Sequence, residues 1–340
     1  MTAYLLVDGT RIEPEMAGSD RFQFRLFLPA QEIRLVSGSA RPADLGLSPD
    51  SRRLGVELSE MRWANGEAMI DVPIDSPSFI DGFHHFETRQ PQNKPVRWTT
   101  GDAGLPPDMV PRWRGETILH LSLKEWRGSD HNPPGNAEAQ VLNAFESLGE
   151  DCEFGLAQRS YDVEPPLTLL RWSGIRYEDL IRGLECEFYG LGDVESTEVA
   201  WSGTQYFLHT PYLSMHTNCI VEQDAAGIAE IAACGRATLR ILRRKLLRDI
   251  AEARRIFVFA SPNPDFSFAQ MRRLHAALRR IGPASLLCVK RAGQRDPAGG
   301  AERLADGLYA GYISEFVKPD GPFDQWLQIC TKAMNLHRCG

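Results

Sequence analysis

The alternation of apolar and polar residues, broken at short intervals by turn residues, most constrains how the first third of this chain can fold. Between residues 4 and 126 apolar side chains recur at every second position in short runs, and none of these runs has helical spacing. The segments with this pattern are Tyr4–Val7, Phe22–Leu28, Glu32–Ser37, Leu54–Leu58, Ala68–Val72, Phe79–Glu87, Val96–Thr99 and Thr117–Leu123. Short strands separated by Gly and Pro predict an antiparallel β-sandwich over residues 1–126.

The pattern changes after residues 127–138 (RGSDHNPPGNAE), which we interpret as a linker because Pro, Gly and small polar residues favour neither helix nor strand. Beyond it, Arg255–Ala260 and Ser285–Val289 are apolar almost throughout, and the amphipathic segment Phe268–Arg280 lies between them. A buried strand, a helix and a second buried strand are typical of a parallel βαβ unit. We therefore predict an α+β protein in which the sandwich is followed by an α/β domain over residues 139–340.

Other periodic segments complete the expected α/β domain. The expected helices are Glu153–Arg159, Tyr177–Cys186, Ala225–Ala253 and Phe323–Met334. The expected short extended segments are Val141–Ser147, Gln205–Leu208 and His216–Val221.

The composition excludes several classes of partner. With a formal net charge of −7, the chain is not basic enough to suggest nucleic acid as a partner. No apolar run approaches the ~20 residues that cross a bilayer, so we expect no membrane span. The seven cysteines are odd in number and scattered without a CxxC pair, which favours reduced thiols and a cytoplasmic location. The sequence does not predict the oligomeric state.

A candidate site follows from the ends of the expected strands. In an open parallel sheet, ligands bind beyond the carboxyl ends of the strands. Three loops are placed there: residues 147–152 (SLGEDC), residues 261–265 (SPNPD) and residues 290–296 (KRAGQRD). Only the second and third belong to the βαβ unit, so the position of the first depends on whether its strand joins the same sheet.

The segment from Phe145 to Trp172 (FESLGEDCEFGLAQRSYDVEPPLTLLRW) is the most distinctive in the sequence. Its SLG-x-x-C element resembles the opening motif of a bacterial family described as papain-like cysteine peptidases of unknown function. The resemblance continues through Tyr206–His216 and the βαβ unit. The chain departs from it at Arg171-Trp172, where the resemblance leads us to expect Asp-Trp. The resemblance implies a cysteine-dependent hydrolase or acyltransferase.

Cys152 is the expected nucleophile. It precedes an expected helix, whose dipole favours the thiolate. The neighbouring carboxylates Glu150, Asp151 and Glu153 oppose a further negative charge. The alternative is a structural cysteine packed in the turn, because free cysteine is among the most buried residue types.

A nucleophilic cysteine also needs a base. His209 and His216 are the candidates, and we favour His216 because it is followed by the polar residues Thr217 and Asn218. Asn263 or Asp265 would orient the imidazole, with Asp265 preferred.

The same loop also fits an anion or sugar site, because Gly149 and a helix N-terminus present backbone N–H groups. The substrate-binding residues predicted on this basis are Gly149, Gln158, Arg159, Arg171, Asn263 and Arg291. The alternative function is therefore a carbohydrate-related protein, either a glycosyltransferase-like enzyme or a sugar-binding partner in bacterial polysaccharide assembly. The substrate would be a small molecule or a carbohydrate.

The sandwich carries a weaker signal of the same kind. The aromatic segment with Phe83, Phe86 and Trp98 and the acid Glu87 resembles small sandwich modules appended to bacterial surface-polysaccharide enzymes. Aromatic rings can stack on sugars, but they pack more often in a core. No metal or cofactor is expected, because His216-x-x-Cys219 is a single pair without a second pair at zinc-like spacing.

Overall fold

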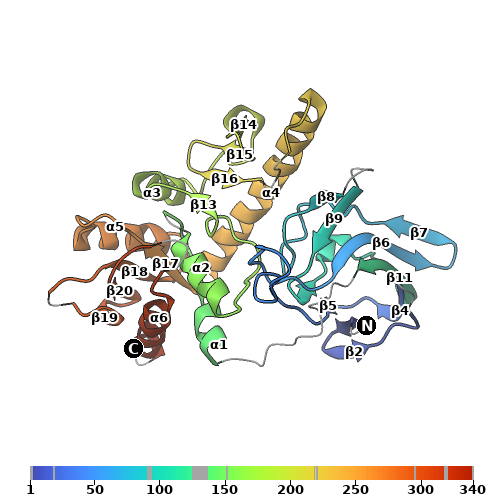
Figure 1. Cartoon of the computed structure of the whole chain (residues 1–340), viewed down its shortest axis with the longest axis horizontal. Coiled ribbons are helices and arrows are strands. Elements are labelled where there is room, and N and C mark those ends of the chain that lie inside the picture. Colours follow the sequence, from blue (N-terminus) through green and yellow to red (C-terminus); the bar gives the residue numbers. More distant parts are fainter. Residues whose placement is uncertain are drawn as a thin grey trace. The chain divides into compact units, whose positions relative to one another are not determined.

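A computed structural model describes residues 3–17, 20–89, 94–124, 137–150, 152–217, 219, 221–294, 296–317 and 321–338. The chain divides into two units (Figure 1). The β unit comprises residues 1–134 together with 164–167, and the α/β unit comprises residues 135–163 and 168–340. Residues 127–136 of the expected linker lie outside the described residues.

The β unit is built from two antiparallel sheets. Its strands are β1 (Tyr4–Val7), β2 (Thr10–Ile12), β3 (Met16–Ala17), β4 (Arg21–Leu28), β5 (Ile33–Val36), β6 (Glu57–Asn65), β7 (Ala68–Asp71), β8 (Glu87–Arg89), β9 (Lys94–Trp98), β10 (Asp102–Gly104) and β11 (Gly115–Lys124). One sheet has the order β10-β5-β1-β2; the other has the order β3-β4-β11-β6-β9-β8, with β7 paired to β6. Leu5 and Leu35 of the first sheet share a core with Phe24, Trp63 and Leu121 of the second. The predicted sandwich-like architecture is confirmed.

The strand predicted at Phe79–Glu87 was inaccurate. Residues 79–86 form no strand; Phe83 makes an isolated bridge to Thr99, and Glu87 begins β8. The backbone turns at Gly82, whose φ is +72°, and a Cβ there would lie 2.0 Å from the carbonyl oxygen of Asp102. This close approach requires glycine and prevents a continuous strand.

The α/β unit contains one mixed and one antiparallel sheet. Its helices are α1 (Ala137–Asn143), α2 (Glu153–Ser160), α3 (Tyr177–Glu185), α4 (Ala225–Ala251), α5 (Phe268–Arg279) and α6 (Phe323–Arg338). Its strands are β12 (Phe145–Ser147), β13 (Ser173–Gly174), β14 (Glu198–Trp201), β15 (Tyr206–His209), β16 (Ser214–His216), β17 (Ile256–Ala260), β18 (Ser285–Arg291), β19 (Gly300–Ala305) and β20 (Leu308–Ile313).

The main sheet has the order β12-β17-β18-β20-β19. The first four strands in this order run parallel and β19 runs antiparallel, so the predicted βαβ unit, β17-α5-β18, is confirmed. A capping box at Ser267 and Gln270 starts α5.

Helices cover both faces of the main sheet (Figure 1). Val258 of β17 packs in one cluster with Phe154 of α2 and Trp326 of α6. The next residue, Phe259, points to the opposite face, where its ring lies 5.9 Å from that of Tyr177 on α3. Because both faces are covered, the strands are apolar almost throughout.

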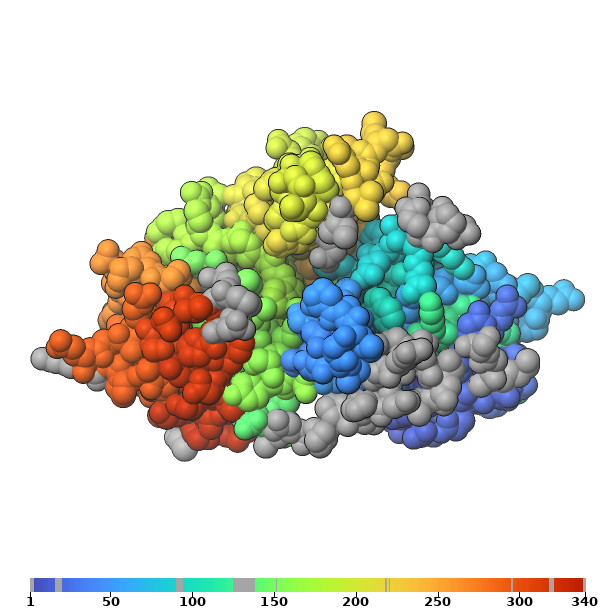
Figure 2. Space-filling model, viewed as in Figure 1, coloured from blue at the N-terminus to red at the C-terminus, as the bar shows by residue number. Residues whose placement is uncertain are grey.

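The second sheet has the order β13-β16-β15-β14 and is antiparallel. Leu208 of β15 faces α4, since a Cβ at Gly235 of that helix would lie 2.5 Å from the leucine side chain. On the other face, His209 and His216 are exposed. The space-filling view shows this yellow-green region at the surface of the α/β unit (Figure 2).

The expected strand Val141–Ser147 was only half right. Its first three residues end helix α1, and only Phe145–Ser147 form β12. Leu142 is fully buried in the cluster that includes residues of α6. A buried leucine at this position is compatible with the buried face of a helix and with a buried strand. Short apolar runs do not separate these alternatives.

Candidate functional site

Three loops of the α/β unit leave the main sheet at one edge. Strands β12, β17 and β18 are parallel neighbours, so their carboxyl ends lie together. The N–H of Leu148 donates to the carbonyl of Val258 (2.8 Å), and the N–H of Ser261 donates to that of Val289 (2.9 Å). The pairing of β12 with β17 thus brings the loop of Cys152 to the edge that the sequence predicted for the other two loops.

Cys152 lies at the turn between β12 and α2. Gly149 has a φ of +88°, and a Cβ there would lie 2.5 Å from Cγ2 of Ile175, so both conformation and space require glycine. The carbonyl of Cys152 accepts the N–H of Leu156 (3.0 Å), while its half-buried side chain makes no capping hydrogen bond. The thiol therefore lies at the positive end of the helix dipole and is partly open to solvent.

His216 ends β16 on the exposed face of the antiparallel sheet. Nε2 of Gln205 lies 2.7 Å from its Nδ1, and the ring of Phe207 is centred 4.5 Å from the imidazole. Desolvation lowers the pKa of His216 from its usual value, because the charged form loses hydration. The neutral imidazole, which is the form that accepts a proton, is therefore favoured.

His209, the other candidate base, lies on the same face of the sheet. Its Nδ1 is 2.8 Å from Oγ of Ser214, and its ring stacks on Phe207 with centroids 6.0 Å apart. The ring of Phe207 thus contacts both imidazoles, one from its own strand and one from β16.

Strand β13 connects the neighbourhoods of Cys152 and His216. A Cβ at Gly149 would lie 3.6 Å from the carbonyl oxygen of Ser173, so the turn before Cys152 packs on β13. Ser173 pairs with Met215, the residue before His216. Among the described residues, no hydrogen bond joins the Cys152 thiol to either candidate imidazole.

Asn263 and Asp265 lie in the exposed loop after β17. Oδ1 of Asn263 accepts the N–H of Asp265 (3.0 Å), and Oγ of Ser261 lies 3.4 Å from the nitrogen of Asn263. These local hydrogen bonds shape the loop as an Asx turn. A role for either side chain in orienting His216 stays a prediction.

Two of the predicted substrate-binding side chains are buried and bonded to the backbone. The amide of Gln158 donates to carbonyls at both ends of residues 142–145 (3.0 and 3.1 Å). Nη2 of Arg171 donates to the carbonyls of Gly155 and Val163 (both 3.2 Å). These contacts hold α2 and the segment after it in place, and they lend no support to substrate binding.

The three predicted arginines differ in exposure. Arg159 and Arg171 both pack on Trp172, with guanidinium carbons 4.6 and 4.7 Å from its ring centre. Arg291, by contrast, is exposed at the last position of β18. Of the three, Arg291 is therefore the one whose side chain faces solvent at the carboxyl edge of the sheet.

Gln205 and Glu146 are not among the residues predicted from the sequence. Gln205 meets His216 through the pairing of β15 with β16, which no local pattern reveals. Glu146 is a buried acid inside β12, and a charge within an apolar strand was a signal that could have found it.

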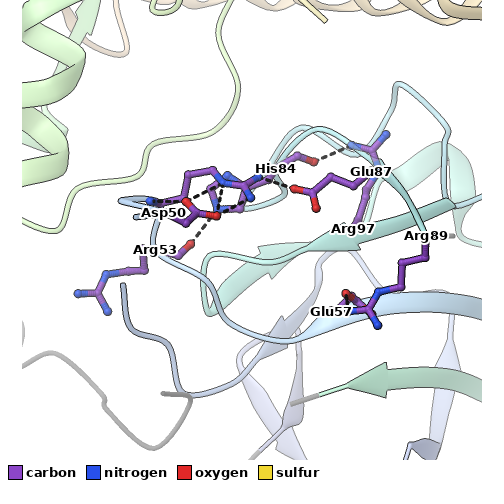
Figure 3. A network of polar contacts seen from close by, with 8 residues as sticks. Asp50, Arg53, Glu57, His84, Glu87, Arg89 and Arg97 are labelled. Carbon is purple, nitrogen blue, oxygen red and sulfur yellow. Dashed lines mark hydrogen bonds and ion pairs between the residues drawn. The ribbon is translucent and has the colours of Figure 1, made fainter. Parts of the chain in front are cut away.

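The aromatic segment of the β unit forms part of its core. Phe83 is buried, and its ring packs at 4.8 Å on that of Phe79. Glu87 accepts from Arg52 (2.7 Å) in a polar network, shown in Figure 3. These contacts favour the packing interpretation over sugar stacking.

Buried arginine supports the loops around this network. Arg97 donates to the carbonyls of Ile74 (2.6 Å), Ser76 (2.7 Å) and His84 (2.8 Å). Nε2 of His84 lies 2.8 Å from the carbonyl oxygen of Arg53 (Figure 3). The carbonyls solvate a buried cation, so the network stabilises irregular backbone.

The described residues hold neither a cluster of metal ligands nor a membrane-spanning helix. No group of three or more His, Cys, Asp or Glu among them could hold a metal ion. In the same part of the chain, no helix is long and apolar enough to cross a membrane.

Comparison with protein-family models, with curated proteins and with solved structures gave no match.

Proposed function

We propose that the α/β unit is a cysteine-dependent hydrolase or acyltransferase, with Cys152 as nucleophile and His216 as base. The observation that carries this proposal is the position of β13. This strand contacts the turn before Cys152 and pairs with the strand that carries His216. The resemblance of residues 145–172 to cysteine peptidases supports the same roles.

The proposed chemistry uses the Cys152 thiol and the His216 imidazole. His216 takes the proton of the Cys152 thiol, and the thiolate attacks an acyl carbonyl to form a tetrahedral intermediate. The leaving group departs with the proton from His216, which leaves a thioester on Cys152. Water then resolves the thioester in a hydrolase, and another nucleophile resolves it in a transferase. A reducing compartment such as the cytoplasm suits a free thiol, and we include that location in the proposal.

Thiol labelling tests the nucleophile. Iodoacetamide is applied from pH 5 to 9, and mass spectrometry resolves each cysteine. Cys186, which is exposed, serves as the reference thiol. Cys288 and Cys330 are fully buried, and burial raises the pKa of both thiols, so they report unfolding. We expect Cys152 to label faster than Cys186 at neutral pH.

The matched pair H216A and H209A tests the base. Both histidines lie on one sheet face, so both variants disturb the same surface. H216A should slow the labelling of Cys152, and H209A should leave it unchanged. If Cys152 labels no faster than Cys186, or if H216A has no effect on its rate, the assignment fails.

The carbohydrate alternative has weaker support. It relied on arginines that face an open cleft, whereas Arg171 is buried and Arg159 packs on Trp172. A small-molecule or carbohydrate substrate remains compatible with acyl transfer, since sugar esters carry acyl groups.

A further inference from the structure

The side chain of Gln205 contacts His216 from a hydrogen-bonded turn. The N–H of Ser202 donates to the carbonyl of Gln205 (3.0 Å), and its hydroxyl donates to the same oxygen (2.9 Å). Ser202 Oγ also accepts the N–H of Gln205 (3.3 Å). The backbone that presents the amide is therefore fixed on both sides.

The imidazole of His216 is restrained in two directions. The Gln205 amide engages Nδ1 at 2.7 Å, and the ring of Phe207 packs at 4.5 Å with an interplanar angle of 46°. A histidine at the end of an exposed strand ordinarily samples several rotamers. These two contacts select one ring orientation and leave Nε2 as the nitrogen directed away from the amide.

The Gln205 amide can form a hydrogen bond with Nδ1 whether or not Nδ1 is protonated. As placed, its NH₂ group donates to Nδ1, which assigns the proton of the neutral ring to Nε2. Rotation of the amide by half a turn places Oε1 at the same position, where it accepts from a protonated Nδ1. The lone pair of Nε2 is then available for a proton.

We propose that Gln205 is the positioning residue of His216, holding Nδ1 so that Nε2 exchanges the proton with the Cys152 thiol. This inference rests on the proposed function. In the step it describes, the S–H bond of Cys152 breaks, its proton forms a bond to Nε2, and the electron pair stays on sulfur. The amide oxygen keeps the hydrogen bond from Nδ1–H as the ring becomes an imidazolium.

Two substitutions separate positioning from simple packing. Q205L keeps much of the side-chain volume but removes both hydrogen-bonding groups. Q205E supplies a carboxylate that favours the imidazolium, so it should raise the pKa of His216. S214A is the matched control, because it removes the equivalent hydroxyl partner of His209.

The first readout is independent of activity. The full-length chain is labelled with ¹⁵N-histidine, and the ring nitrogens are followed by NMR against pH. In wild type one neutral tautomer of His216 should dominate. Q205L should mix the tautomers, Q205E should move the titration to higher pH, and S214A should affect His209 alone. An unchanged His216 spectrum in Q205L overturns the proposal.

The second readout is the pH profile of Cys152 labelling. A neutral hydrogen bond contributes about 1 kcal/mol, so Q205L should slow labelling about fivefold at neutral pH. Unchanged labelling in Q205L, where H216A does slow it, overturns the positioning role. If H216A leaves labelling unchanged as well, the proposed function fails, and the NMR result still decides whether Gln205 orients the ring.

Discussion

Oε2 of Glu146 lies 3.8 Å from Nζ of Lys245, and the carboxylate is almost completely buried. Lys245 also donates to the carboxylate of Asp249 one turn further along α4. Lys245 thus forms ion pairs with two buried acids, and neither oxygen of Glu146 has a hydrogen-bond partner among the described residues. Burial is the main cause that raises the pKa of Glu146 above its usual value of 4.5; Asp249 adds to the rise, and Lys245 and Arg255 oppose it.

Removal of the cation should cost far more than removal of the acid. K245M removes the nearest cation from two buried carboxylates, and breaking a buried pair in this way costs about 3–5 kcal/mol. E146Q should cost much less, because it removes the desolvation penalty together with the attraction. Urea unfolding of both variants measures the free energies of unfolding. A larger loss in E146Q than in K245M would contradict this interpretation.

The same carboxyl group should make stability depend on pH. Its folded pKa is raised, so its favourable contribution is complete below the unfolded pKa and is lost as pH rises through the folded pKa. The E146Q variant has no titrating group at this position, so it does not lose stability in this way. The free energy of unfolding of E146Q minus that of wild type should therefore increase with pH above about 4.5, near the ordinary glutamate value. A difference that stays flat between pH 5 and 8 argues against the shift.

The indole of Trp326 anchors the start of α2. Its Nε1 donates to Oε1 of Glu153 (2.8 Å), and both side chains are fully buried. W326F keeps the ring packing but removes an N–H donor from a buried acceptor, which should cost about 1–3 kcal/mol. E153Q retains an acceptor and serves as the control. Thermal unfolding should rank W326F below E153Q; the reverse order would show that the hydrogen bond contributes little.

Gly149 and Gly203 form a matched pair of glycines in the α/β unit. Their φ values are +88° and +92°, but only at Gly149 would a Cβ meet another side chain, that of Ile175. G149A and G203A should share the backbone penalty of about 1–2 kcal/mol for this conformation. G149A should lose more, because the overlap adds to it. Equal losses in chemical denaturation would mean that Ile175 moves aside at no cost.

His85 of the β unit should stay neutral well below neutral pH. Burial, together with the positive charge of Arg97, His84 and Arg52, lowers its pKa to about 4. The unfolded chain binds the proton more tightly, so stability should fall as pH drops from about 6.5 towards 4. H85Q should reduce this fall. NMR titration of His85 provides the direct check, and a midpoint near 6.5 would disprove the shift.

Local patterns in the sequence predicted much of the fold because they act within one element. The alternation of apolar and polar residues predicted the two-sheet β unit. Two apolar runs on either side of an amphipathic segment predicted β17-α5-β18. The patterns failed at residues 141–143, which fit a helix as well as a strand, and at Gly82, where a glycine turns the chain. The same local reasoning placed Cys152 before a helix.

The sequence by itself therefore determined the class of each unit, the βαβ element and the turn that carries Cys152. Only the tertiary structure decided that β12 pairs with β17, that β13 pairs with β16, and that Gln205 meets His216. Strand pairing joins residues far apart in the chain, and a register change of one residue turns every side chain to the other face of a sheet. Such choices depend on the packing of the whole unit, which a local sequence pattern does not contain.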